Sequence, residues 1–129
     1  MFIGRERELQ ELNRLFESDR FEFAVIYGRR RVGKTALITQ FIRDKDAIYF
    51  MGVESSSKQN LENLSKSIIE YSSGIEADTS FLSFQAALEY VFKLAETKRL
   101  ILVIDEYPYV ARASKSLAST LQMLIDRYR

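Results

Sequence analysis

The sequence predicts an α/β fold of three layers, in which a parallel sheet lies between helices. Two observations lead to this prediction. Short apolar segments typical of buried strands alternate with helical patterns along the chain. The clearest segment, residues 100–104, is apolar throughout, as in strands that are covered on both faces. Because ligands of such sheets bind at the carboxyl ends of the strands, we expect the functional residues at that edge.

In the first half of the chain, helix and strand patterns alternate. Residues 5–16 carry apolar side chains at helical spacing among charged ones, which predicts an amphipathic helix. Residues 23–27 form a short apolar run that ends at a glycine, the pattern of a buried strand. Residues 34–42 again have one apolar helical face, and residues 47–51 are a second strand candidate that ends at Gly52.

The second half continues this alternation. The serines at 55–57 predict a loop that caps the next helix, which we expect over residues 61–71. Apolar spacing predicts a further helix over residues 81–96. The strand at 100–104 follows, and a last helix is expected over residues 114–128. Strands that alternate with helices in this way indicate βαβ units with right-handed crossovers.

Composition limits the possible functions. The chain has 129 residues, which fits a single domain over residues 1–129, and 47% of them are hydrophobic. It contains no Cys and no His, so catalysis would depend on carboxylates, Lys, Arg, hydroxyl groups or a bound cation. The net charge of +1 gives no support to a polyanionic partner such as DNA. No apolar run approaches the roughly 18 residues of a membrane span, and no signal peptide is evident, so we expect a cytoplasmic protein without membrane association.

A glycine-rich motif follows the first predicted strand. Residues 28–35, Gly-Arg-Arg-Arg-Val-Gly-Lys-Thr, match G-x-x-x-x-G-K-[ST] in full. Its glycines allow the backbone to wrap round an anion, so that N–H groups and the positive end of the next helix meet a phosphate. Lys34 would place its charge at the β- and γ-phosphates, and the Thr35 hydroxyl would bind Mg²⁺. A chance match is the alternative, which the strand–loop–helix context disfavours.

The motif therefore predicts a purine nucleotide as ligand, either ATP or ADP, with Mg²⁺ as cofactor. The expected contacts come from the loop and the start of the helix: Gly28, Arg31, Val32, Gly33, Lys34, Thr35 and Ala36. Because the backbone forms the cradle, the side chains of residues 29–31 are expected to point into solvent, and direct contact of one arginine with a phosphate is the alternative. The guanine-reading motif N-K-x-D is absent from the sequence, which favours ATP over GTP only weakly.

Two carboxylates follow the strand at 100–104. Asp105 would hold Mg²⁺, usually through a water molecule, and Glu106 would orient or deprotonate the water that attacks the γ-phosphate. Lys34 and Glu106 are thus the candidate catalytic residues, and Thr35 and Asp105 the candidate metal ligands. The alternative for Glu106 is a solvated acid at a helix start. Pro108, the one proline of the sequence, suits the opening of a turn or helix.

Three stretches together resemble the archaeal and bacterial P-loop ATPases of the AAA+/STAND type: residues 2–9, the glycine-rich motif, and residues 104–109. The resemblance implies a P-loop NTPase fold with Walker A and Walker B motifs. It also implies that Phe2, Ile3 and Arg5 lie by the adenine base. The alternative is that these N-terminal residues only begin and cap the first helix.

The chain departs from that family in ending one helix after the Walker B strand. The family sheet has the strand order 5-1-4-3-2, and only strands one, two and three are recognisable here. We therefore expect a partial P-loop domain that lacks its C-terminal strands and any further domains. Exposed sheet edges would then favour self-association.

The predicted function is Mg²⁺-dependent ATP binding by the ATPase domain of an AAA+/STAND-like protein, with hydrolysis to ADP in the intact protein. One alternative is a DNA-associated ATPase related to initiators or helicase loaders. Another is an interaction module that binds nucleotide without hydrolysing it.

Overall fold

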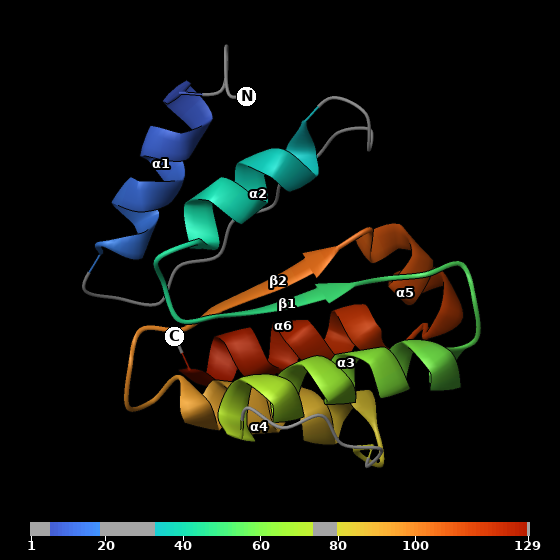
Figure 1. Ribbon diagram of the computed structural model, residues 1–129. Coiled ribbons are helices and arrows are strands. Elements are labelled where there is room, and N and C mark those ends of the chain that lie inside the picture. The colour runs from blue at the N-terminus through green and yellow to red at the C-terminus, as the bar shows by residue number, and fades with distance from the viewer. Residues whose placement is uncertain (1–5, 19–32, 74–79, 129) are drawn as a thin grey trace. The chain divides into compact units, whose positions relative to one another are not determined.

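The computed structural model describes residues 6–18, 33–73 and 80–128, which form six helices and one two-stranded sheet (Figure 1). The chain divides into two compact units. The first comprises Met1–Asp46 with Arg129, and the second comprises Ala47–Tyr128. The described part of the chain contains no helix that is both long and apolar enough to cross a membrane.

In the first unit, helix α1 (Glu6–Phe16) contacts helix α2 (Lys34–Ile42). The ring of Phe16 meets the ring of Phe41 edge to face, with 6.3 Å between centroids and an interplanar angle of 87°. This is a favoured geometry for two aromatic rings, because the positive edge of one faces the negative face of the other. The contact joins the C-terminal ends of the two helices.

Lys45 closes the C-terminal end of α2. Its Nζ donates to the carbonyl oxygen of Phe41 at 2.8 Å and to Oδ1 of Asp44 at 3.1 Å. The same ammonium group lies 4.6 Å from the ring centroid of Phe41 and 5.3 Å from that of Phe16. A cation at this position satisfies a terminal carbonyl and opposes the negative end of the helix dipole. The hydrogen bond from Lys45 lowers the pKa of the exposed Asp44 carboxyl.

The second unit contains the sheet. Strand β1 (Ala47–Met51) pairs in parallel with strand β2 (Ile101–Asp105), in a register that runs from Ala47 opposite Ile101 to Met51 opposite Asp105. Ile48 and Phe50 are 1% and 2% exposed, whereas their neighbours in β1 are half-buried. This alternation gives β1 one fully covered face, as the period of two in a strand requires.

Helices α3 (Ser57–Ser73), α4 (Phe84–Leu94) and α6 (Leu117–Tyr128) lie along one side of the sheet (Figure 1), and the short helix α5 (Tyr107–Ala113) follows β2 directly. The core of this unit is formed by apolar side chains that are at most 2% exposed and come from β1 and all four helices: Ile48, Phe50, Leu64, Ile68, Ala87, Leu88, Val110, Leu117 and Leu124. The chain is therefore an α/β protein with a parallel sheet, as expected.

Several predicted boundaries are confirmed. The helix at 34–42 and the strand at 47–51 have the expected bounds. The second strand lies one residue later than expected, because Asp105 still pairs with Met51. Its burial on both faces was predicted wrongly: residues 101–104 are each partly exposed, and β1 is its one partner among the described strands.

Helix starts differ more from the expectation. The helix expected from residue 81 begins at Phe84, because Ser83 is extended (φ −155°) and its hydroxyl accepts from the N–H of Ala86 at 3.0 Å. The helix expected from residue 61 begins already at Ser57, and the hydroxyl of Ser56 accepts from the N–H of Gln59 at 3.1 Å, which confirms a serine cap.

The expected last helix is also shorter than predicted. Helix α6 starts at Leu117, and α5, which has Pro108 in its first turn, occupies residues 107–113 before it. The expected strand at 23–27 lies outside the described residues.

Candidate functional site

The end of the glycine-rich motif lies at the start of α2. Gly33 precedes the helix with φ 85° and ψ 13°, a left-handed conformation that favours glycine. Its carbonyl oxygen accepts from the N–H of Leu37 at 2.9 Å, which begins the helix. The glycine that the motif requires is therefore also the residue that lets the chain turn into α2.

Lys34 and Thr35 occupy the first turn of this helix. Lys34 is only 6% exposed, and Thr35 is half-buried, whereas Ala36 is exposed. A lysine is seldom buried to this extent unless its charge is compensated. The side chain of Lys34 is thus not an ordinary solvated surface charge.

The remaining predicted nucleotide contacts lie outside the described residues: Phe2, Ile3, Arg5, Gly28, Arg31 and Val32. For these residues the sequence predictions stay predictions.

In the second unit, Asp105 ends β2 and is only 2% exposed. Its Oδ1 accepts from the backbone N–H of Glu106 at 3.0 Å. Its Oδ2 accepts a short hydrogen bond from the hydroxyl of Tyr49 on β1. Both carboxylate oxygens are therefore held by donors, so that the side chain has a defined orientation at the carboxyl end of the sheet.

Gly52 fastens the end of β1 to the same turn. Its N–H donates to the carbonyl oxygen of Asp105 at 2.8 Å. A β-carbon on residue 52 would stand 2.7 Å from the carbonyl oxygen of Glu106 and 2.5 Å from Cγ2 of Val110. Only glycine fits this space unless the backbone shifts, so the segment after β1 and the turn after β2 form one tightly packed structure.

Asn60 on α3 fixes the segment that follows Gly52. The side chain is fully buried. Its Oδ1 accepts from the N–H of Val53 at 3.0 Å, and its Nδ2 donates to the carbonyl oxygens of Val53 and Ser56 at 3.1 and 3.0 Å. The buried amide thus satisfies the N–H of Val53 and adds a second donor to two carbonyl oxygens, which also accept from the backbone N–H groups of Ser55 and Asn60.

Glu106 stands at the N-cap of α5 in a left-handed conformation, with φ 55° and ψ 42°. It is the one non-glycine residue with positive φ in the described part of the chain. Its side chain is half-buried and does not cap the helix by a hydrogen bond. Strained backbone of this kind costs on the order of 1–3 kcal/mol and is concentrated at functional sites. The residue lies at a helix start, as both interpretations of its role expect, and its backbone there is left-handed.

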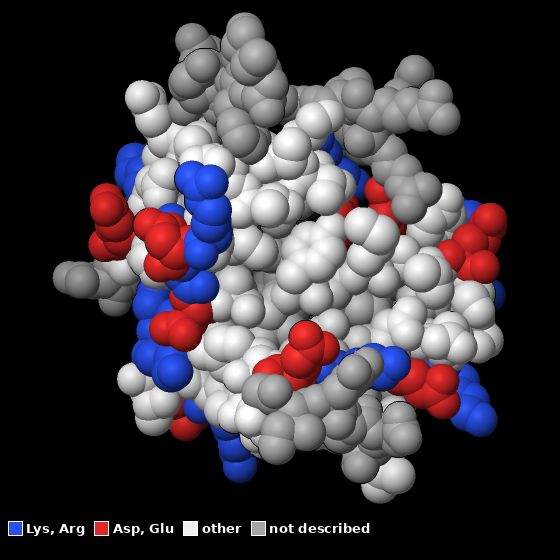
Figure 2. Space-filling model, in the orientation of Figure 1, with Lys and Arg blue, Asp and Glu red and all other residues white. Residues whose placement is uncertain are grey.

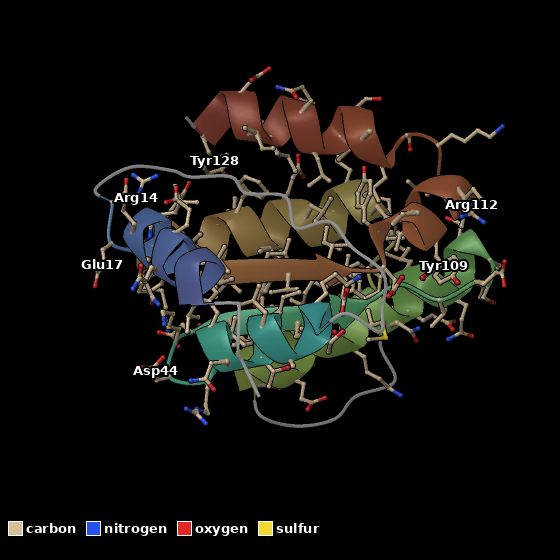
Figure 3. The ribbon with its side chains drawn as sticks, turned by 90° about the horizontal axis from the view of Figure 1, so that it is seen from above. Arg14, Glu17, Asp44, Tyr109, Arg112 and Tyr128 are labelled. Atoms are coloured by element: carbon tan, nitrogen blue, oxygen red, sulfur yellow. The ribbon has the colours of Figure 1, made fainter. Side chains whose placement is uncertain are left out.

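A shallow depression of about 250 Å³ lies next to this turn. It is lined by Glu54 and Ser55 from the segment after β1 and by Tyr109, Arg112 and Ala113 from α5. The guanidinium of Arg112 lies 5.5 Å from the ring centroid of Tyr109, and Figure 3 shows both side chains on α5. On the face drawn in Figure 2, the described basic and acidic side chains are interspersed rather than gathered by sign.

The donor set at Asp105 fits a magnesium ion that is shared with phosphates. The described residues contain no group of three or more His, Cys, Asp or Glu side chains that could hold a metal by themselves. Mg²⁺ in nucleotide sites is commonly bound by one or two carboxylates, water and the substrate phosphates. A single buried and oriented carboxylate is therefore suited to this role.

Sequence reasoning missed Tyr49, Gly52 and Asn60. Tyr49 and Gly52 donate to Asp105, which is remote in sequence, and Asn60 bonds to the loop that precedes its own helix. The one local signal was the glycine directly after a predicted strand, which can mark a close backbone approach.

Comparison with known proteins shows which family the chain resembles. The sequence pattern of a family described as ATPase domains predominantly from Archaea matches residues 2–128. An uncharacterized protein of Methanocaldococcus jannaschii is 34% identical over 126 residues, which cover 98% of this chain and 26% of that relative. The chain thus spans about a quarter of the length of that protein.

Two shorter similarities involve proteins named for ATP binding. An uncharacterized ATP-binding protein of the same organism is 44% identical over 45 residues, 35% of this chain and 76% of the relative. An uncharacterized ATP-binding protein of Pyrococcus abyssi is 49% identical over 43 residues, 33% of this chain and 13% of the relative. No solved structure matches the chain.

Proposed function

Because the chain belongs to the family of ATPase domains found predominantly in Archaea, we propose that it binds ATP with Mg²⁺ through its P-loop. In the intact protein this domain hydrolyses ATP to ADP, and nucleotide state acts as a conformational switch of the AAA+/STAND type. Relatives that are named ATP-binding proteins support a nucleotide ligand.

The P-loop residues have distinct roles in this proposal. The backbone from Gly28 to Gly33 surrounds the phosphates, and the ammonium group of Lys34 neutralises the β- and γ-phosphates. The hydroxyl of Thr35 binds Mg²⁺. Support comes from the left-handed Gly33 and from the start of α2 at Lys34, since a helix N-terminus offers N–H groups and a positive dipole end to an anion.

The turn after β2 supplies the second half of the chemistry. Asp105 holds Mg²⁺ through a water molecule, and Glu106 orients the water that attacks the γ-phosphate and accepts its proton. Mg²⁺, when bound, neutralises the charge that develops on the phosphate oxygens. The observation that carries the proposal is the buried Asp105, whose two oxygens are both held by donors at the carboxyl end of a parallel strand.

The sheet supports a P-loop arrangement of its strands. The strand after the P-loop helix pairs in parallel with the Walker B strand, as the order 5-1-4-3-2 places strands two and three side by side. The proposal therefore includes a three-layer P-loop domain of which residues 1–129 form a part, and which can self-associate through sheet edges.

Calorimetric titration of the chain with ATP tests this function. We expect micromolar binding in the presence of Mg²⁺, loss of binding in Lys34→Ala, and no change in Lys58→Ala, which removes an exposed lysine of α3. Unchanged binding in Lys34→Ala would contradict the proposal.

Phosphate release separates hydrolysis from simple binding. We expect any turnover above background to be lost in Glu106→Gln, while that variant still binds ATP. Binding without turnover under all conditions would favour the non-hydrolysing interaction module instead.

A further inference from the structure

Tyr49 reaches Asp105 diagonally across the two strands. Asp105 stands opposite Met51 in the register, and Tyr49 lies two residues before Met51 in β1. Because side chains two residues apart share a face of a strand, Tyr49 and Asp105 project from the same face of the sheet. The long tyrosine side chain spans this diagonal, since its hydroxyl donates to the carboxylate of Asp105.

The hydroxyl of Tyr49 binds one specific oxygen of the carboxylate. It donates to Oδ2, while the N–H of Glu106 donates to Oδ1. Two donors at two different oxygens fix both the position and the tilt of the carboxylate plane. Each carboxylate oxygen has two lone pairs and can accept from more than one donor, of which a metal-bound water is one kind.

The carboxylate of Asp105 is buried, so its orientation depends on protein groups more than on water. Asp105 is 2% exposed, so bulk water has little access to the carboxylate. The backbone beneath it is also fixed, because its carbonyl oxygen accepts from the N–H of Gly52 at 2.8 Å. The orientation of the carboxylate towards a cation is therefore set by protein donors, and the side-chain hydroxyl of Tyr49 is one of them.

We propose that Tyr49 is a positioning residue for magnesium: its hydroxyl holds Asp105 in the orientation that accepts a Mg²⁺-bound water. This inference rests on the proposed function and adds to it a residue outside both nucleotide-binding motifs. Partners that orient a metal-binding side chain typically contribute about 10–100-fold to metal affinity or activity. We assign Tyr49 no contact with the nucleotide, because it acts on the metal through Asp105.

The test measures metal dependence apart from catalysis. The chain is titrated with fluorescent ATP at a series of Mg²⁺ concentrations and again in EDTA, and Mn²⁺ binding in the presence of ATP is followed by electron paramagnetic resonance. The variants are Tyr49→Phe, Asp105→Asn and the double variant. Tyr90→Phe is the matched control, because Tyr90 lies on α4, is 39% exposed and packs against the ring of Phe81.

We expect Tyr49→Phe to raise the half-saturating Mg²⁺ and Mn²⁺ concentrations about tenfold and to leave nucleotide affinity in EDTA unchanged. In the Asp105→Asn background, the same substitution is expected to change metal affinity by less than about twofold, because the two residues act as one unit. Tyr90→Phe should match the unmodified chain.

A change of less than twofold in Tyr49→Phe, with folding confirmed by circular dichroism, would overturn the inference while leaving the proposed function intact. If Tyr49→Phe lowered metal affinity equally in the unmodified chain and in the Asp105→Asn background, the inference would be overturned as well. Failure of the unmodified chain to bind ATP with or without metal would overturn both.

Discussion

Gly52 lies so close to Val110 that a β-carbon at position 52 would stand 2.5 Å from Cγ2 of the valine. Val110 is fully buried in α5, and the same β-carbon would also meet the carbonyl oxygen of Glu106 at 2.7 Å. The segment after β1 is thereby packed against the turn that carries both proposed catalytic-site carboxylates. A disturbance at Gly52 is expected to reach Asp105 and Glu106 through this contact.

Replacement of Gly52 by Ala should destabilise the chain by about 1–3 kcal/mol, the usual cost of forcing extra atoms into a packed site. Urea denaturation measures the change. Ala118→Ser, at an exposed position of α6, is the control and should remain within about 0.5 kcal/mol of the unmodified chain. Equal stability of Gly52→Ala and the unmodified chain would mean that the close approach is not maintained in solution.

Asn60 and Asn63 provide a matched pair on one helix. Asn60 is fully buried with three hydrogen bonds, whereas Asn63 is half-buried and accepts one exposed bond from Gln59. Asn60→Ala should cost about 2–3 kcal/mol, because the buried N–H of Val53 loses its acceptor and the carbonyl oxygens of Val53 and Ser56 each lose one donor. Asn63→Ala should cost less than about 0.5 kcal/mol. Similar losses in the two variants, measured by thermal denaturation, would contradict the anchoring role of Asn60.

We expect the glutamate at position 106 to support ATP hydrolysis at some expense in the stability of the folded chain. Glu106→Gly relieves the left-handed backbone and is expected to leave the chain as stable or up to about 1 kcal/mol more stable. The same variant should lose ATP hydrolysis, because the proposed base is gone. Glu106→Gln retains the backbone strain and is the control for stability. A marked destabilisation by glycine would show that the glutamate side chain has a structural role.

Lys45 should add about 1 kcal/mol to the free energy of unfolding of the first unit, because it bonds to the end of α2 and lies over two aromatic rings. Lys45→Met keeps the apolar stem and removes the charge, and thermal denaturation measures the loss. Nuclear magnetic resonance titration should show the pKa of Asp44 rising towards its ordinary value, because Lys45 is the first cause of its depression. An unchanged pKa of Asp44 in Lys45→Met would contradict the contact.

The same contact predicts a pH dependence. A depressed pKa stabilises the folded state at pH values above the ordinary carboxyl pKa, and this contribution is lost as the pH falls through the lowered value. The stability difference between the unmodified chain and Lys45→Met should therefore narrow as the pH falls below 3.8, the ordinary pKa of an aspartate.

Local patterns were sufficient to predict α2 and β1. The start of α2 at Lys34 follows from a glycine that turns the chain and from apolar residues at helical spacing, both of which are properties of neighbouring residues. The position of Asp105 at the end of a strand could likewise be predicted, because an apolar run that ends in acids is visible in the sequence. Its burial with both oxygens held could not be predicted.

The missed features depend on register and on tertiary approach. The bond from Tyr49 to Asp105 exists because β1 and β2 pair with Met51 opposite Asp105, and no local pattern fixes that register. The start of α4 was misplaced because Phe81 and Leu82 continue the apolar spacing, yet the cap at Ser83 begins the helix after them, and Leu82 is 98% exposed. The start of this helix is therefore set by the capping hydroxyl of Ser83 and not by the apolar spacing.

The anomalous scattering of Mn²⁺ in crystals of the chain grown with a non-hydrolysable ATP analogue tests most directly whether the P-loop and Asp105 bind one nucleotide-associated metal. We expect one metal peak bound by the Thr35 hydroxyl and the phosphates, with a metal-bound water donating to the carboxylate of Asp105. A nucleotide bound away from residues 28–35, or a metal with no contact to Asp105 directly or through water, would contradict it.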